Sequence, residues 1–123
     1  MNRDSCYAFY GSLRQGMYNY KRYQKHLNYL FTENLSGFNL YALERYPIAV
    51  KTNSSADTIK VEVMQIIDPI IENEIHQLEM KAGYYYEEVF VGGLLAGIYL
   101  FHENGKSPLV PGGDWVQFFG QQV

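Results

Sequence analysis

The segment Tyr10-Gly11-Ser12-Leu13 has the residue types of an anion-binding turn. It directly follows an alternating, aromatic stretch from Ser5 that is typical of a strand. A strand that ends in a glycine turn can aim successive backbone N–H groups into one concavity, and such a concavity binds a carboxylate or oxyanion without a net positive charge on the protein. The segment therefore predicts a small anion site. The alternative is a turn with a purely structural role.

Glu79 is the second residue that could carry chemistry. Ile71, Ile75 and Leu78 fall at helical spacing, and Glu79 flanks this apolar stripe about one turn before Gly83, where the helix is expected to end. A carboxylate near a helix C-terminus faces the negative end of the helix dipole, and partial burial adds a desolvation cost. Both effects raise the pKa of the carboxyl group, which suits a general acid/base at neutral pH. The alternative is a solvated surface glutamate.

Other common catalytic patterns are not found in the sequence. His26, His76 and His102 are far apart and form no HxxH or HExxH pattern, so no metal site is expected. The residues around Ser12 do not form a GxSxG motif, and there is no Walker loop or GxGxxG motif. Cys6 is the only cysteine, which excludes an internal disulfide and a multi-cysteine zinc site.

The composition is that of a globular protein. The 123 residues are 47% hydrophobic and 19% charged, which is enough for one domain over residues 1–123. Thirteen acidic residues against ten basic ones give a net charge of −3. Binding the phosphate backbone of a nucleic acid requires a basic surface, so this charge argues against nucleic-acid binding. The N-terminus lacks the long apolar run of a signal peptide, and the longest uncharged stretch, 89–101, is shorter than the roughly 20 residues that span a bilayer. We expect a soluble, cytoplasmic protein that binds neither nucleic acid nor a membrane.

The elements that position these residues are expected to be short strands and two helices. Strands are expected at 5–10, 35–43, 48–50, 59–66, 84–91 and 94–101. A first helix is indicated by four apolar residues at helical spacing: Tyr20, Tyr23, Leu27 and Leu30. A second helix is expected to begin at Asp68-Pro69 and to end by Gly83. This pattern predicts an α+β fold with a mixed, mainly antiparallel sheet that can curl into a small β-barrel flanked by two or more helices.

Four short motifs along the chain resemble those of the gamma-glutamylcyclotransferase-like superfamily, and they occur in that family's order. Residues 9–14 resemble its YGSLR or YGTLR signature, and residues 75–79, followed by Tyr85, resemble its L-D-x-L-E-G…Y segment. Tyr46-Pro47 resembles its Y-P step, and residues 113–115 resemble its G-D-W motif. The resemblance covers nearly the whole chain.

The resemblance implies a compact barrel with a pocket at one mouth. It implies that the backbone amides of Tyr10, Gly11, Ser12 and Leu13 hold the substrate's alpha-carboxylate and that Glu79 is the catalytic acid/base. The family reaction is an intramolecular aminolysis, in which the alpha-amine of a gamma-glutamyl group attacks its own gamma-carbonyl and gives 5-oxoproline and a free amine or amino acid. This chemistry needs no metal or other cofactor. Tyr85 is a candidate oxyanion stabiliser by its position.

The chain departs from the family pattern beside the expected pocket. His76 stands where the family has Asp, Met80 where it has Gly, and Glu87 where its Y-x-R step has Arg. A substrate that is selected through a second carboxylate is therefore expected to bind less well.

Two further hypotheses remain open at the level of the sequence. One is a catalytically silent module that binds a small carboxylate or anion in the same pocket. The other is an interaction domain, in which exposed tyrosines and Phe118-Phe119 form a homodimer interface.

Overall fold

The computed structural model describes residues 4–122, and the side chains from residue 4 to residue 120. This part of the chain forms three α-helices, two short 3-10 turns and seven strands. The helical elements are α1 (Tyr18–Tyr23), η1 (Gln24–His26), α2 (Pro69–Lys81), η2 (Pro111–Gly113) and α3 (Trp115–Gln122). The strands are β1 (Cys6–Phe9), β2 (Leu27–Ser36), β3 (Phe38–Leu43), β4 (Tyr46–Lys51), β5 (Thr58–Ile66), β6 (Tyr85–Val91) and β7 (Leu94–Leu100).

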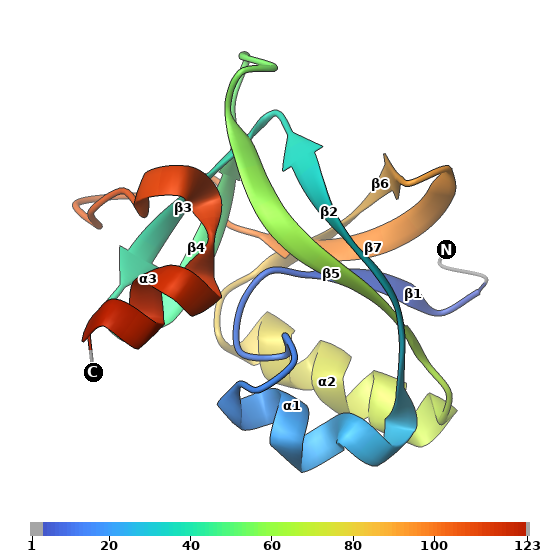
Figure 1. The fold of residues 1–123 in the computed structure, drawn as a ribbon. Helices are drawn as coiled ribbons and strands as arrows, with labels where there is room; N and C mark the ends of the chain where they lie inside the picture. The colour runs from blue at the N-terminus through green and yellow to red at the C-terminus, as the bar shows by residue number, and fades with distance from the viewer. Residues whose placement is uncertain (1–3, 123) are drawn as a thin grey trace.

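The strands form a five-stranded sheet and a separate hairpin. The large sheet has the order β2-β5-β1-β7-β6, and its pairs are antiparallel except for β1 and β7, which are parallel. The hairpin pairs β3 with β4 and lies beside α3, while α1 and α2 lie next to each other under the sheet (Figure 1). The α+β fold with a mostly antiparallel sheet is therefore confirmed.

The sheet curls without being closed by hydrogen bonds between the strands at its two edges. The Phe31 ring on β2 reaches Gly92 in the turn between β6 and β7, and a Cβ on that glycine would lie 2.6 Å from the ring. The hairpin covers the open side, and the Phe101 amide donates to the Ala49 carbonyl at 2.9 Å. Side-chain packing and the hairpin thus give the sheet its barrel-like shape.

Buried side chains lie on both faces of the sheet. Cys6, Ala8 and Tyr10 point from β1 toward the hairpin and α3, while Tyr7 and Phe9 point toward α1 and α2. All four residues of β1 are buried, because this central strand has a neighbouring strand on each side and a packed layer on each face. In residues 4–122 no helix has the length and apolar character that crossing a membrane requires.

The second helix agrees with its sequence signals. The Asp68 side chain accepts a hydrogen bond from the Ile70 amide at 2.9 Å, and Pro69 occupies the first helical position, where its missing N–H costs nothing. The helix ends at Lys81, two residues before Gly83. The hairpin of β6 and β7 also turns at Gly92-Gly93 as expected.

The helix expected to run through Leu27 and Leu30 is wrong. Helix α1 ends at Tyr23, and strand β2 begins at Leu27 after one 3-10 turn. Leu27 pairs with Ile66 of β5, and the pairing register shifts between Tyr29 and Phe31. Leu30 is the unpaired residue at this irregularity and is 37% exposed, so it shares no buried face with Leu27, and the long pairing with β5 overrides the weak local preference for a helix. The sequence also did not predict helix α3.

Gly113 is expected to tolerate no side chain. Its φ is +65°, and a Cβ would lie 2.2 Å from the Thr58 carbonyl oxygen. Gly113→Ala should lower the free energy of unfolding by about 3 kcal/mol or more, because backbone strain and a clash with the main chain of β5 combine. Urea unfolding would measure the change.

Gly105→Ala is the matched control. Its φ of +57° is similar, but a Cβ there meets nothing within 4 Å. It should cost only about 1 to 2 kcal/mol, the penalty of the left-handed conformation. Equal losses for the two variants would contradict the packing argument.

Candidate active site

The turn after β1 has backbone donors without protein partners. The Arg14 amide donates to the Gly11 carbonyl, and the Tyr20 amide donates to the Ser12 carbonyl, both at 3.0 Å. The Ser12 hydroxyl accepts from the Asn19 side chain at 2.7 Å. The amides of Gly11, Ser12 and Leu13 have no acceptor elsewhere in residues 4–122. Consecutive free amides in a buried turn are the donors that an anion needs.

Gly11 is required by a close contact with the β4 strand. A Cβ on Gly11 would lie 2.5 Å from Cγ of Pro47, so the proline ring occupies the space of a side chain. The Pro47 carbonyl in turn accepts a hydrogen bond from the Tyr84 hydroxyl at 2.6 Å. Pro47 therefore packs on Gly11 of the turn, and Tyr84, which follows α2 in the chain, holds Pro47 through this hydrogen bond.

Tyr10 connects three strands at the beginning of the turn. Its hydroxyl donates to the Tyr99 carbonyl of β7 at 2.5 Å and accepts from the Ala49 amide of β4 at 3.3 Å. The side chain is only 6% exposed. Burial raises the pKa of Tyr10 well above its usual value, with further contributions from Tyr84 and Glu79. Tyr10 therefore remains a neutral hydroxyl and fixes the place where the turn leaves the sheet.

Glu79 lies on the inner side of the last turn of α2. Leu78 beside it is 41% exposed, whereas Glu79 is more buried. Burial raises the pKa of Glu79 from 4.5 to about 7. No side chain within residues 4–120 forms a hydrogen bond with its carboxyl group. The raised pKa expected from the sequence is thus present, and the removal of the carboxyl group from water is its cause.

Tyrosines from several elements surround Glu79. Burial raises the pKa of Tyr84 and of Tyr99, and the nearby charge of Glu79 raises both further. Tyr10 responds to the same charge, so the structure brings Glu79 close to the residue that begins the turn. At neutral pH the carboxyl group can exchange a proton, while these hydroxyl groups stay protonated.

Tyr85, the remaining predicted site residue, begins β6. Its ring stacks on His102 with centroids 4.0 Å apart and an angle of 10° between the planes. Its hydroxyl is close enough to contribute to the raised pKa of Tyr10, after burial and larger neighbours, and to that of Lys51. Tyr85 therefore lies near both Tyr10 and Lys51.

The sequence did not reveal the polar layer between α2 and the sheet. Glu72 accepts hydrogen bonds from the Ser5 and Tyr7 hydroxyls at 2.7 and 2.5 Å. His76 Nδ1 lies 2.9 Å from the Tyr99 hydroxyl. Glu72, His76 and Glu79 are spaced by four and then three residues, so they share one face of α2. The helical spacing of these three residues was the signal in the sequence that could have predicted the polar layer.

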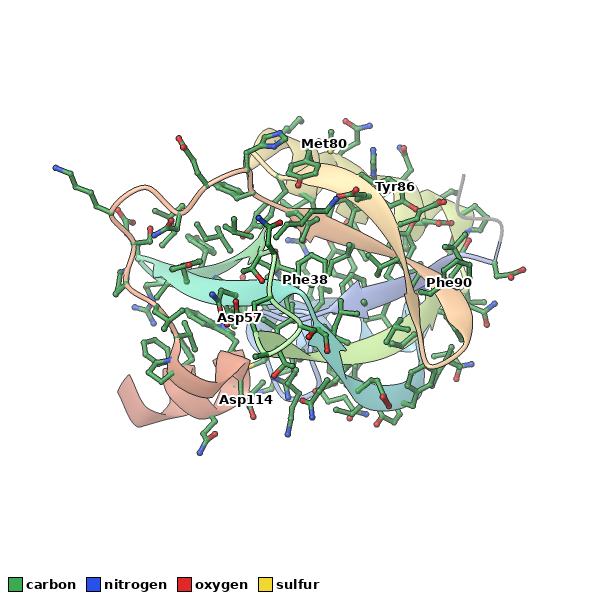
Figure 2. All side chains as sticks on the ribbon, turned by 90° about the horizontal axis from the view of Figure 1, so that it is seen from above. Phe38, Asp57, Met80, Tyr86, Phe90 and Asp114 are labelled. Carbon is green, nitrogen blue, oxygen red and sulfur yellow. The ribbon has the colours of Figure 1, made fainter. Side chains whose placement is uncertain are left out.

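Arg14 closes the turn and does not face Glu79. It is 5% exposed, and its Nε lies 2.9 Å from Oε2 of Glu62. Its Nη1 lies 2.8 Å from Oδ1 of Asp114. Figure 2 shows Asp114 at the beginning of α3, on the side of the molecule opposite Met80 at the end of α2. The ion pairs therefore couple the turn to the G-D-W segment.

Two surface grooves lie away from these residues. One, of about 450 Å³, runs between α1 and α2 and is lined by residues that include Arg22, Glu74 and Lys81. The other, of about 620 Å³, lies beside α3 and includes Phe118 and Phe119. Neither groove is lined by Glu79 or by the turn, so groove size does not identify the chemical site. The candidate site rests instead on the raised pKa of Glu79 and on the free amides of the turn.

Comparisons with known proteins agree with this geometry. The profile of the family described as "Gamma-glutamyl cyclotransferase, AIG2-like" matches residues 7–117. No curated protein sequence gives a significant match.

Solved structures share the fold. The uncharacterized protein PH0828 from Pyrococcus horikoshii has 26% identity and a TM-score of 0.79 over 95% of this chain and 94% of its own. YtfP from Escherichia coli has 27% identity and a TM-score of 0.70 over 90% and 96% of the two chains. An AIG2-like protein from Mus musculus, also titled GGACT, has 13% identity and a TM-score of 0.66 over 90% and 93%, which shows a common fold.

Arg14→Met should lower the free energy of unfolding by about 3 to 5 kcal/mol, because it leaves the buried Glu62 carboxylate without its cation. Lys60→Met is the control, since the Lys60 side chain is 40% exposed and its Nζ lies 3.7 Å from Oδ2 of the same Asp114. It should cost less than about 1 kcal/mol. Chemical denaturation of the wild type and both variants would measure the free energies of unfolding. Similar decreases for the two variants would contradict a stabilising role of the buried Arg14–Glu62 ion pair.

Glu79 should make the protein less stable as the pH rises. The unfolded carboxyl group ionises near pH 4.5, but the folded one keeps its proton until about pH 7. The folded state binds more protons in this window, so the ionisation of Glu79 lowers the free energy of unfolding by on the order of 3 kcal/mol as the pH rises from 4.5 to 7. Glu79→Gln should therefore be more stable than the wild type at pH 8 and similar to it at pH 4.

Urea unfolding at both pH values would measure this difference. Glu33→Gln, at an exposed position on β2, is the control and should follow the wild type throughout. A constant difference between Glu79→Gln and the wild type would show that the carboxyl group is not desolvated.

Proposed function

Because the chain belongs to the gamma-glutamyl cyclotransferase, AIG2-like family, we propose that it converts a gamma-glutamyl amide into 5-oxoproline and a free amine or amino acid. The observation that carries this proposal is the buried Glu79 carboxyl group, with a pKa of about 7, close to the turn that begins at Tyr10. A group with that pKa can both accept and return a proton at neutral pH.

In the proposed complex, the turn binds the substrate's alpha-carboxylate. The free amides of Gly11, Ser12 and Leu13 donate to the carboxylate oxygens, and these donors are fixed before binding because Pro47 and Arg14 hold the turn. Rigid donors lose little conformational entropy when the ligand arrives. This placement leaves the alpha-amine and the gamma-carbonyl of the substrate to face Glu79.

The proposed reaction needs one acid/base group. The ionised Glu79 removes a proton from the substrate's alpha-ammonium group, and the freed amine attacks the gamma-carbonyl carbon to form the ring C–N bond. The protonated Glu79 then donates to the leaving nitrogen as the original amide C–N bond breaks, and the second proton of the ring nitrogen passes through the same carboxylate to the departing amine, which leaves as an ammonium. Nucleophile and electrophile belong to one molecule, so proximity comes from the substrate itself.

The carbonyl oxygen becomes negatively charged during the attack and needs a donor. Tyr85 is the proposed source. In the part of the chain that the structure describes, its hydroxyl has no hydrogen-bond partner, whereas the Tyr10 and Tyr84 hydroxyls donate to backbone carbonyls. The side chain also lies near Tyr10.

Incubation with a panel of gamma-glutamyl amides, followed by mass spectrometry of 5-oxoproline, tests the proposal. The wild type should form product, and Glu79→Gln should lose at least about 100-fold in kcat/KM, because the acid/base group is removed. Activity should also fall below pH 7, where Glu79 becomes protonated and cannot accept the proton.

Glu74→Gln is the matched control, since Glu74 is an exposed residue on another face of the same helix. It should retain activity. Equal product from wild type and Glu79→Gln would exclude Glu79 as the acid/base. Binding of a gamma-glutamyl amide without product would leave a catalytically silent binding module.

A further inference from the structure

The groove beside α3 has no part in the proposed reaction. It has a volume of about 620 Å³ and lies between α3 and the β3–β4 hairpin, which stand next to each other in Figure 1. The hairpin and α3 each contribute three of its lining residues: Ala42, Glu44 and Arg45, and Trp115, Phe118 and Phe119. The groove therefore combines an aromatic wall with a pair of charged side chains.

Large apolar side chains are exposed at the edge of this groove. Leu43 and Tyr46 flank the hairpin turn and are 40% and 62% exposed. Leu109, which follows a further lining residue of the groove, Pro108, is 50% exposed. Exposed apolar side chains that adjoin an aromatic groove favour association with another surface.

The turn between β3 and β4 adds one acid and one base to this surface. It consists of Glu44 and Arg45, because Leu43 pairs directly with Tyr46. The Arg45 guanidinium lies over the Phe119 ring, with 5.7 Å between Cζ and the ring centroid, so α3 holds it in the groove. Neither Glu44 nor Arg45 forms an ion pair with a side chain in residues 4–120.

Glu44 has a backbone conformation that favours glycine. Its φ is +56°, in the left-handed region, where a glutamate costs conformational free energy that a glycine would not. Such an outlier indicates that the side chain has a role beyond the local turn. Within the described part of the chain, nothing forms a hydrogen bond or ion pair with the Glu44 carboxylate. A partner for it therefore has to come from another molecule.

We propose that two copies of the chain associate through this surface about a two-fold axis at the hairpin turn. The axis places Glu44 opposite the partner's Arg45 and Arg45 opposite the partner's Glu44, while the apolar side chains around the turn cover each other. One patch can serve both copies because it is self-complementary. The whole chain has a net charge of −3, but the turn holds one acid and one base, so two copies do not repel each other there.

A small carboxylate is the alternative occupant of the groove, since Arg45 and the ring of Phe119 would suit it. Glu44, the neighbour of Arg45 in the turn, argues against this ligand because its negative charge repels a carboxylate. A second copy satisfies both charges and also covers the exposed Leu43, Tyr46 and Leu109. The observations therefore favour a second copy.

Sedimentation velocity over a range of micromolar concentrations tests the proposal. The wild type should sediment as a dimer at the upper end of this range. Glu44→Arg and Arg45→Glu each place like charges opposite each other at both symmetric contacts. Each variant should therefore raise the dissociation constant of the dimer by about 100-fold.

An equimolar mixture of the two variants is the diagnostic sample. One chain then carries two arginines at the turn and the other carries two glutamates, so both contacts again join opposite charges. The mixture should form a heterodimer, although each variant alone stays monomeric. Lys25→Glu is the matched control, because it makes the same charge change as Arg45→Glu at an exposed position on η1, and it should dimerise like the wild type.

Glu44→Gly separates association from stability. Glycine relieves the left-handed backbone, so at a concentration where the wild type is monomeric the variant should unfold at an equal or higher urea concentration. Its dimer should nevertheless dissociate more readily, by about tenfold, because the carboxylate is missing. A weaker dimer of this variant cannot be attributed to a damaged fold.

Three results would overturn the proposal. The first is a wild type that stays monomeric at every concentration. The second is a wild-type dimer that Glu44→Arg and Arg45→Glu also form, because that dimer would use another face. The third is a mixture of the two monomeric variants that stays monomeric, which would exclude the reciprocal contact of Glu44 and Arg45.

Discussion

The buried ion pair of Arg14 is the interaction on which the rest of the site depends. One guanidinium binds Glu62 in the middle of the sheet and Asp114 at the beginning of α3, while Glu62 also accepts the Gln15 amide at 2.8 Å. These contacts fix the end of the turn, and Pro47 fixes its start by packing on Gly11. The backbone amides between them are thus fixed in place, while their N–H groups remain free to donate. Arginine suits this role because its planar group can bind two carboxylates in fixed directions.

The unusual carboxyl group of Glu79 is a property of the surrounding layer of tyrosines. Rings from β1, β7 and the segment after α2 exclude water from the end of the helix, and the hydroxyls of Tyr10 and Tyr84 are directed to backbone carbonyls. Glu72, on the same face of α2, has the opposite environment, because it accepts two hydroxyl hydrogen bonds. Two glutamates on one helix face therefore have different surroundings: two hydroxyl groups donate to Glu72, whereas burial raises the pKa of Glu79.

Much of this arrangement could be predicted from the sequence, and the exceptions have physical causes. The α+β fold, helix α2 and the β6–β7 hairpin follow from local signals such as the Asp68 cap. Glu79 was singled out because it flanks the helical spacing of Ile71, Ile75 and Leu78, and the structure buries Glu79 more deeply than Leu78, which is 41% exposed. The helix expected through Leu27 and Leu30 was wrong because the long pairing of β2 with β5 overrides the local helical spacing. The roles of Arg14 and Tyr99 depend on partners far along the chain, which no local pattern contains.

The Arg14–Asp114 contact also limits when the turn can take its final form. Its two residues are 100 positions apart, and most of the sheet lies between them in the chain. During synthesis, the N-terminal strand emerges long before its ionic partner and before β7, its parallel neighbour. The turn after β1 is thus made well before the residues that fix it, and it takes its final form only when Asp114 is present, which is the kinetic consequence of such distant contacts.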